Sequence, residues 1–158
     1  MDLTAPTEQE ARAKVEAALP YCRDWWLVDR VVEQGDAQIV TRWTAPEAPY
    51  YRRGDDGAPL LLPGAIALEH LVQSGELLVL LERHGRPKED GVPVLGRVRS
   101  ASFRAMVPPG AQIESTLRLT DRVSAAYYVS AVSKVDGRVA VKAELTFTAT
   151  DAIQRLTR

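Results

Sequence analysis

The sequence contains few of the residues on which several common chemistries depend. Its 158 residues include one cysteine and two histidines, so an internal disulfide is excluded and a Cys/His metal-ligand set is not expected. Aromatic residues make up 6% of the chain and the formal net charge is −1, which gives no general attraction to nucleic acid or to an anionic membrane. We therefore expect no metal, no cofactor and no nucleic-acid partner.

Long hydrophobic runs are also missing. The longest uninterrupted apolar stretch, residues 77–81, is too short to cross a bilayer, and the first 18 residues lack the apolar run of a signal peptide. No repeat and no Pro/Gly/Ser-rich linker divides the chain. We expect one domain over residues 1–158, with a tail at 151–158, no membrane association and a cytoplasmic location.

The first half of the chain holds signals for a helix and then for strands. Thr7 and Glu10 have the spacing of a capping box, which predicts a short helix over about 8–19 within an N-terminal segment 1–19. Strands are predicted over 25–33 and 39–43, with a turn signal at Gly35-Asp36 between them. Residues 45–62 contain three prolines and two glycines and are predicted to form a long loop.

A longer helix is predicted from Pro63-Gly64 to about residue 83, because proline is well placed in a first helical turn. This helix is apolar nearly all round, which is typical of a helix buried on most sides. Its polar exceptions fall at i, i+4 and i+7 on one face: Glu69, Gln73 and Glu76.

From about residue 92 onward the pattern has a period of two, which predicts about four antiparallel strands with one buried face. Asp136-Gly137 marks a turn between the last two. A single buried helix wrapped by a curved antiparallel sheet belongs to the α+β class.

Four short motifs follow one another between residues 19 and 147. They are L-P and L-V-D-R-V within 19–31, P-Y-Y at 49–51, P-G-x-x-x-x-E-x-x-x-Q at 63–73 and F-R-x-x-V-P-P-G at 103–110. In this order and spacing the sequence resembles the beta-hydroxyacyl-[acyl carrier protein] dehydratases. The resemblance implies the hotdog fold, in which a long helix is wrapped by a sheet of five to six strands and two protomers join sheets edge to edge.

The sequence departs from that family in one loop. The resemblance implies an active site at the dimer interface, with a His from one subunit's loop and a Glu or Asp from the other subunit's helix. The family loop reads G-H-F-P-G-H-P, whereas residues 53–59 read R-G-D-D-G-A-P, with one extra residue before Pro63. When the two loops are aligned, the position of the family's catalytic His is occupied by Gly54, or by Asp55 if the alignment has no gap. The chain's two histidines, His70 and His84, lie elsewhere.

Dehydration of a 3-hydroxyacyl thioester needs a base for the α-proton, an acid for the departing hydroxyl and donors for the thioester oxygen. Glu69 suits the role of the acid, because a carboxyl on an apolar helix is desolvated and keeps its proton near neutral pH. The N–H groups around Gly64 suit the role of hydrogen-bond donors to the thioester oxygen. The base is missing, since Asp55 in an exposed loop would be weaker than an imidazole.

Several further residues are candidates for binding. Gln73 is expected to position a neighbouring group, and Tyr51 to lie at the mouth of an acyl tunnel. Trp25 and Trp26 are predicted to be core residues, although either could line that tunnel. Three arginines either receive an acidic acyl carrier protein or form a solvated basic face: Arg97, Arg99 and Arg104. His70, about 100° from Glu69 on the helix, is predicted to pack.

Three functions remain open. The first is a subunit of a 3-hydroxyacyl-[acyl carrier protein] dehydratase of fatty acid, polyketide or polyene-type biosynthesis, inactive alone. It would place Glu69 in a site shared with a His-bearing hotdog partner and act on an acyl thioester of a carrier protein or of coenzyme A. The second is a thioesterase that uses Glu69 as base or nucleophile. The third is a non-catalytic homodimer that binds acyl chains or serves as a structural subunit.

Overall fold

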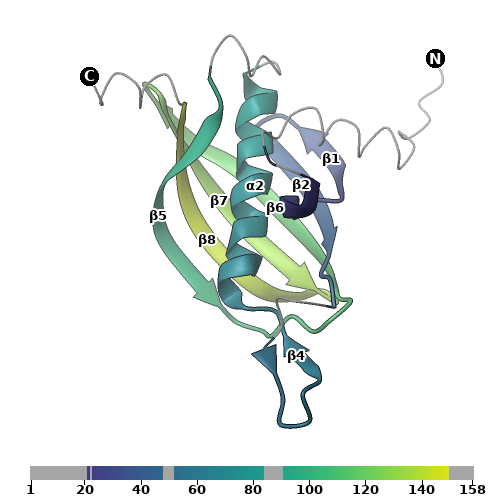
Figure 1. Ribbon diagram of the computed structural model, residues 1–158. Helices are drawn as coiled ribbons and strands as arrows, with labels where there is room; N and C mark the ends of the chain where they lie inside the picture. The colour runs from purple at the N-terminus through teal and green to yellow at the C-terminus, as the bar shows by residue number, and fades with distance from the viewer. Residues whose placement is uncertain (1–20, 22, 48–51, 84–90, 150–158) are drawn as a thin grey trace, which may run out of the picture.

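The computed structural model describes residues 21, 23–47, 52–83 and 91–149. One long helix, α2 (Gly64–Glu82), lies against a six-stranded antiparallel sheet that curves around it (Figure 1). The strand order is β1-β2-β6-β7-β8-β5. The strands are β1 (Arg30–Gly35), β2 (Gln38–Thr44), β5 (Pro93–Phe103), β6 (Gln112–Val123), β7 (Ala126–Val135) and β8 (Arg138–Ala149). The predicted α+β class and hotdog arrangement are confirmed.

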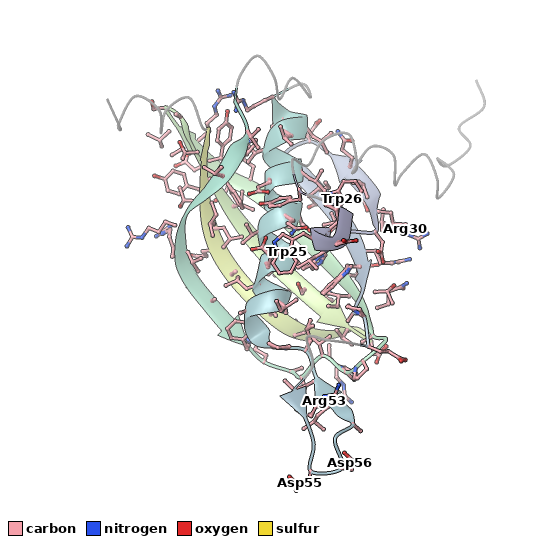
Figure 2. All side chains as sticks on the ribbon, viewed as in Figure 1. Trp25, Trp26, Arg30, Arg53, Asp55 and Asp56 are labelled. Atoms are coloured by element: carbon pink, nitrogen blue, oxygen red, sulfur yellow. The ribbon has the colours of Figure 1, made fainter. Side chains whose placement is uncertain are left out.

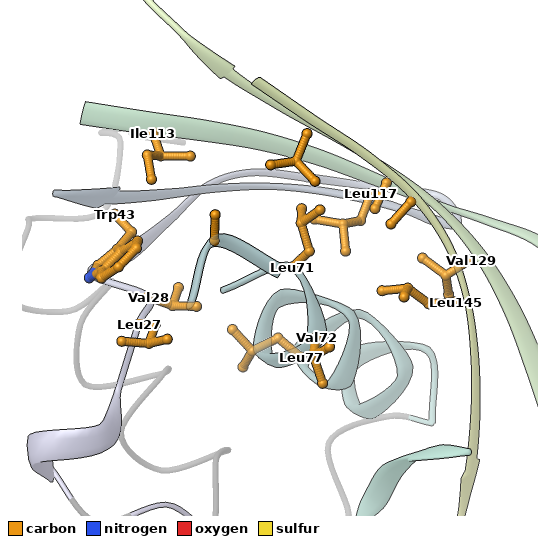
Figure 3. Close-up of a cluster of buried hydrophobic side chains, with 14 of the residues drawn as sticks. Leu27, Val28, Trp43, Leu71, Val72, Leu77, Ile113, Leu117, Val129 and Leu145 are labelled. Carbon is orange, nitrogen blue, oxygen red and sulfur yellow. The ribbon is translucent and has the colours of Figure 1, made fainter. Parts of the chain in front are cut away.

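The hydrophobic core lies between α2 and the sheet. Residues of β7 and β8 alternate between buried and more exposed positions, as a period of two requires. Their buried members, among them Val129 and Leu145, face helix residues such as Leu71 and Leu77 (Figure 3). The helix is buried along most of its length because sheet and chain cover it on several sides.

Tight turns join the strand pairs at the positions that the sequence indicates. Asp136 and Gly137 both have positive φ, 50° and 75°, which suits a two-residue hairpin turn between β7 and β8. Between β1 and β2 the residue with positive φ is Ala37, at 57°. The turn signal at Gly35-Asp36 is therefore displaced by one residue, since Gly35 still pairs with Gln38 in the sheet.

Two predictions for the N-terminal half are corrected. The predicted strand 25–33 begins only at Arg30, and Arg23–Trp25 form a single 3-10 turn, η1, because the backbone of Trp25 and Leu27 binds α2. Asp29, directly before β1, already binds β2 through Arg42 and Thr44. The predicted loop 45–62 contains a short hairpin of β3 (Arg52–Arg53) and β4 (Pro59–Leu61). This hairpin projects beyond the N-terminal end of α2 (Figure 1).

The start of α2 also differs slightly from the prediction. Pro63 is the N-cap, with φ −56° and ψ 135°, and Gly64 is the first helical residue. The predicted helix 8–19, the tail 151–158 and Tyr51 lie outside the described residues.

By length and composition alone, α2 could cross a membrane, with a mean hydropathy of 1.3 over an 18-residue window. Two thirds of that window (67%) is buried inside the fold, however, and a core helix meets the same criterion. The expectation of no membrane association rested on the shorter run 77–81, which understates how apolar the helix is.

Candidate active site

Three polar side chains of α2, spaced by three residues, bind one segment of the chain. We call this segment the strap: Tyr21 together with residues 23–27. His70 binds the Leu27 carbonyl, Gln73 binds the backbone of Trp25 and Leu27, and Glu76 binds the Tyr21 hydroxyl. Residues three apart lie on one side of a helix, so the strap runs antiparallel along α2. Figure 2 shows Trp25 in front of the helix and Trp26 beside it.

Gln73 is the centre of this arrangement. It is fully buried, and its Oε1 accepts from the Leu27 N–H at 2.8 Å. Its Nε2 donates to the Trp25 carbonyl at 2.9 Å and to Oε1 of Glu69 at 3.1 Å. One amide therefore holds the strap and the Glu69 carboxylate together.

Glu69 is half-buried on the same face of α2. The bond from Gln73 fixes one of its carboxylate oxygens one turn along the helix. The carboxyl that is fully buried is Glu76, which is 3% exposed. The strong desolvation that the sequence argument assigned to Glu69 therefore acts on Glu76.

The Tyr21 hydroxyl donates to both carboxylate oxygens of Glu76, at 3.0 and 2.8 Å. Burial raises the pKa of Glu76 to about 7, the bond from Tyr21 opposes that rise, and the charge of Glu69 adds to it. The pKa of Tyr21 is also raised, first by burial and then by the Glu76 charge. Glu76 was named in the sequence only as a polar exception. The signal for it was a carboxylate directly before the apolar run 77–81.

His70 packs in the core, as predicted. It is fully buried, stacks on Trp43 with ring centroids 5.4 Å apart, and burial lowers its pKa to about 4. Because the Leu27 carbonyl can only accept, Nδ1 must carry the proton. Nε2 then accepts from the Ser115 hydroxyl at 2.8 Å. A neutral imidazole held on both nitrogens is not available as a base.

A cavity of about 300 Å³ lies at the N-terminal end of α2, where the first N–H groups of a helix have no intrahelical partner. Gly64, Ala67, Phe103 and Arg104 are among its lining residues, and Glu69 is not. Within one chain, the structure thus brings Gly64 and Arg104 together and leaves Glu69 on a separate part of the helix.

Asp55 does not join either group. It is exposed at the tip of the β3–β4 hairpin, and Figure 2 shows it pointing away from α2. Its neighbour Asp56 accepts from the Ala58 N–H at 2.9 Å and so helps to form the turn. Gly54, the other position aligned with the family histidine, lies in the same turn.

The three arginines predicted to bind a carrier protein do not all face one way. Arg97 and Arg99 are exposed on the outer face of β5, since Arg97 pairs with Thr146 and Arg99 lies 3.9 Å from Glu144. Arg104 follows the end of β5 and lines the cavity.

The prediction that both tryptophans belong to the core holds only in part. Trp26 is partly buried and packs against the core, and its indole Nε1 is buried without a hydrogen-bond partner in the described structure. Trp25 is 45% exposed and is not a core residue, because Gln73 holds its backbone while its ring faces outward. Among the described residues, no group of three or more His, Cys, Asp and Glu side chains could hold a metal ion.

Comparison with known proteins places this chain in a family. No family model matches the sequence. The 3-hydroxyacyl-[acyl-carrier-protein] dehydratase FabZ of Anaeromyxobacter sp. (strain K) is 30% identical over 132 residues, 82% of this chain and 84% of the relative. FabZ of Latilactobacillus sakei is 35% identical over 141 residues, 85% and 94% of the two chains. The chain belongs to the FabZ dehydratase family.

Solved structures of similar proteins support the fold of this chain. The dehydratase heterocomplex ApeI:P from Xenorhabdus doucetiae matches with a TM-score of 0.73 and 19% identity, over 91% of this chain and 97% of the other. Thioesterase superfamily member 2 from Mus musculus matches with a TM-score of 0.64 and 12% identity, over 92% and 98%. Identities this low establish a shared fold and nothing about the reaction.

Proposed function

We propose that this FabZ-family chain is the histidine-lacking subunit of a two-chain 3-hydroxyacyl-[acyl carrier protein] dehydratase, in fatty acid, polyketide or polyene-type biosynthesis in the cytoplasm. It supplies Glu69 to a site whose base is a histidine of a hotdog partner. The observation that carries the proposal is the contrast between two residues of α2. Glu69 stands at the family's acidic position with a carboxylate oriented by Gln73, while the neighbouring His70 is sealed in the core.

The reaction assigns one task to each group. The partner's imidazole removes the α-proton of the thioester, and the resulting enolate-like oxygen accepts hydrogen bonds from N–H groups at the start of α2, near Gly64. In its protonated form, Glu69 gives its proton to the 3-hydroxyl, which leaves as water, and the carboxylate that remains is the form that accepts the bond from Gln73. Electrons from the broken α-C–H bond form the new C=C bond as the C–O bond breaks, so the step needs no cofactor.

Two further features support the proposal, one for a carrier-bound substrate and one for a second chain. The cavity beside Gly64 is lined by Arg104, a positive charge suited to the phosphate or acidic surface of an acyl carrier protein. A dehydratase heterocomplex is among the chain's structural neighbours, which is consistent with a two-chain enzyme. Asp55, exposed and directed away from α2, has no part in the proposed chemistry. Tyr51 is assigned to the tunnel mouth by the family motif alone.

The test is to mix the chain with a His-bearing hotdog dehydratase subunit from the same organism and measure water loss from a 3-hydroxyacyl carrier protein. We expect no activity from this chain alone and a rate for the mixture well above that of the partner alone. Glu69→Gln in this chain should lower the kcat of the mixture by a factor of about 10² to 10⁴, the range for loss of a general acid.

Gln73→Glu is the matched control for the positioning of Glu69. It keeps the size of the side chain but replaces the donor to Glu69, which is also the donor to the Trp25 carbonyl, with a second carboxylate, so kcat should fall. No gain on mixing would contradict the proposal. Hydrolysis of an acyl thioester by the isolated chain, abolished by Glu69→Gln, would favour the thioesterase function. A mixture indifferent to Glu69→Gln would favour the non-catalytic one.

A further inference from the structure

Helix α2 holds Leu27 of the strap at both of its backbone polar groups. Gln73 accepts from the Leu27 N–H at 2.8 Å, and His70 donates to the Leu27 carbonyl through Nδ1. Leu27 is 3% exposed, so a backbone group that lost its partner here would be left buried and unsatisfied. The position of this one residue along α2 is therefore set by two side chains.

The sheet in turn holds His70. Its Nε2 accepts from the Ser115 hydroxyl of β6 at 2.8 Å, and the Ser115 hydroxyl lies 2.8 Å from that of Ser133 on β7. Trp43 of β2 stacks on the imidazole ring. All four of these side chains are buried. Three strands thus fix the place and the plane of one imidazole.

The hydrogen bonds of this buried chain can run in one direction only. Burial lowers the pKa of His70 to about 4, so the ring is neutral and, with its proton on Nδ1, accepts at Nε2. The Ser115 hydroxyl is then used as a donor to the ring, and Ser133 must donate to Ser115. A buried network in which each group has a single role favours one arrangement of its members.

The position of Leu27 decides which end of the Gln73 amide faces Glu69. Because Leu27 presents an N–H group, Oε1 of Gln73 turns toward it, and Nε2 is left to donate to Glu69 at 3.1 Å. The Trp25 carbonyl, which accepts from the same Nε2, favours the same orientation. If Leu27 moved away, the amide would be free to turn over and to place an acceptor beside the Glu69 carboxylate.

We propose that His70 is a positioning residue for the dehydration. It holds the Leu27 carbonyl, and Leu27 orients the Gln73 amide that fixes Glu69. His70 itself touches neither the substrate nor the reacting atoms. This inference rests on the proposed function for the acid role of Glu69. It adds a task for a buried histidine that the proton transfers do not use.

Two variants of nearly equal size test the bond from His70. His70→Asn keeps an N–H at the position of Nδ1, His70→Leu has none, and both lose the stack on Trp43 and the bond from Ser115. In the mixture with the His-bearing partner, we expect kcat to fall at least about tenfold for His70→Leu and about threefold at most for His70→Asn. KM should stay close to that of wild type, since Glu69 acts on substrate that is already bound. Equal losses in the two variants, or no loss in either, would overturn the inference.

A second pair of variants removes one buried hydroxyl each and carries the test if a His70 variant does not fold. Ser115→Ala removes the partner of Nε2, whereas Ser74→Ala breaks a bond to Thr41 at the same helix–sheet contact, 2.8 Å long and equally buried. We expect Ser115→Ala to lower kcat about threefold or more, and Ser74→Ala to leave it within about twofold of wild type. Similar values for the two would contradict the proposed role of His70.

The isolated chain tests the same geometry without any reaction. In nuclear magnetic resonance experiments, the Leu27 amide should exchange with solvent at least about tenfold faster in His70→Leu than in His70→Asn. The nitrogen-15 shifts of the wild-type imidazole should show a protonated Nδ1. Equal exchange rates, or a protonated Nε2, would overturn the inference. An inactive wild-type mixture would contradict the proposed function, and the exchange rates would still decide whether His70 holds Leu27.

Discussion

A buried carboxyl with an altered pKa is the feature of single residues that most affects this protein. Glu76 lies one and two turns beyond Gln73 and Glu69 on α2, and it is bonded to Tyr21 of the strap. In the folded chain its pKa is about 7, against an ordinary value of 4.5. The folded state therefore holds a proton that the unfolded state releases, and folding becomes linked to pH.

We predict that the free energy of unfolding falls as pH rises from 4.5 through 7, and that Glu76→Gln removes most of this fall. The sign follows from the raised pKa, since the stabilisation is complete below 4.5 and is lost once the buried carboxyl ionises. The difference between the two proteins should change by at most about 3 kcal/mol over this range. Urea titrations at a series of pH values measure it.

Tyr21→Phe is the matched variant for this prediction. It removes the hydroxyl that favours the ionised carboxyl, so the fall in stability should extend to higher pH than in wild type. Parallel pH profiles of wild type and Glu76→Gln would show that Glu76 is not the responsible group.

At the scale of residues, the sequence showed which side chains of α2 are unusual, but it predicted their surroundings less well. The apolar character of α2 marked Glu69 and Gln73 as unusual, and it placed His70 in the core. It did not distinguish which carboxyl is desolvated, because burial depends on the strap, whose docking on α2 joins residues about 50 positions apart. No local pattern encodes such a contact.

At the scale of elements, α2 approaches the sheet closely through a glycine. A Cβ added at Gly75 would lie 2.6 Å from Cε2 of Phe147, which is fully buried at the centre of the core. The close approach explains why a helix interior that otherwise favours good helix formers holds a glycine here. Packing at this point fixes the depth at which α2 lies in the sheet.

We predict that Gly75→Ala lowers the free energy of unfolding by about 1–3 kcal/mol, because overpacking of the core outweighs the gain in helix propensity. Gly64→Ala is the control within the same helix. There the added Cβ meets the ring of Phe103 at 2.9 Å, but that ring is half-exposed and can turn aside, so the change should stay below about 1 kcal/mol. Thermal unfolding compares the two, and equal losses would contradict the argument.

Elements were easier to predict than their ends. The period-two pattern located β6 to β8 because each buries one face, and the apolar run located α2. The predicted strand 25–33 was wrong over its first five residues, since β-branched and aromatic residues there bind the helix and leave the sheet. The β3–β4 hairpin was missed because its strands are only two and three residues long.

At the scale of the whole molecule, the two edges of the sheet differ. β5 has eleven residues and is exposed from Gly96 onward, whereas β1 has six residues. Both edges carry register shifts, one in β1 between Val31 and Glu33 and two in β5, so length and exposure are what distinguish them. The resemblance indicated that sheets join edge to edge. The sequence alone could not identify the edge, because strand order in the sheet is not strand order in the chain.

We predict that the His-bearing partner protects β5 and not β1 from amide hydrogen exchange. In the isolated chain, the β5 amides directed away from β8 should exchange rapidly, and those of β8, paired on both sides, should exchange slowly. Addition of the partner should slow exchange in residues 93–103 by at least about tenfold. Exchange followed by mass spectrometry reports this without any activity assay, and new protection in β1 alone would contradict it.

The spacing of His70, Gln73 and Glu76 has a mechanical consequence. A helix that turned by one residue would swing all three side chains through about 100° and lose every bond to the strap in a single movement. A slide along its axis would do the same. The strap therefore fixes both the rotation and the axial position of α2, so the angle at which Glu69 is presented is set by residues that lie more than forty positions before it in the chain.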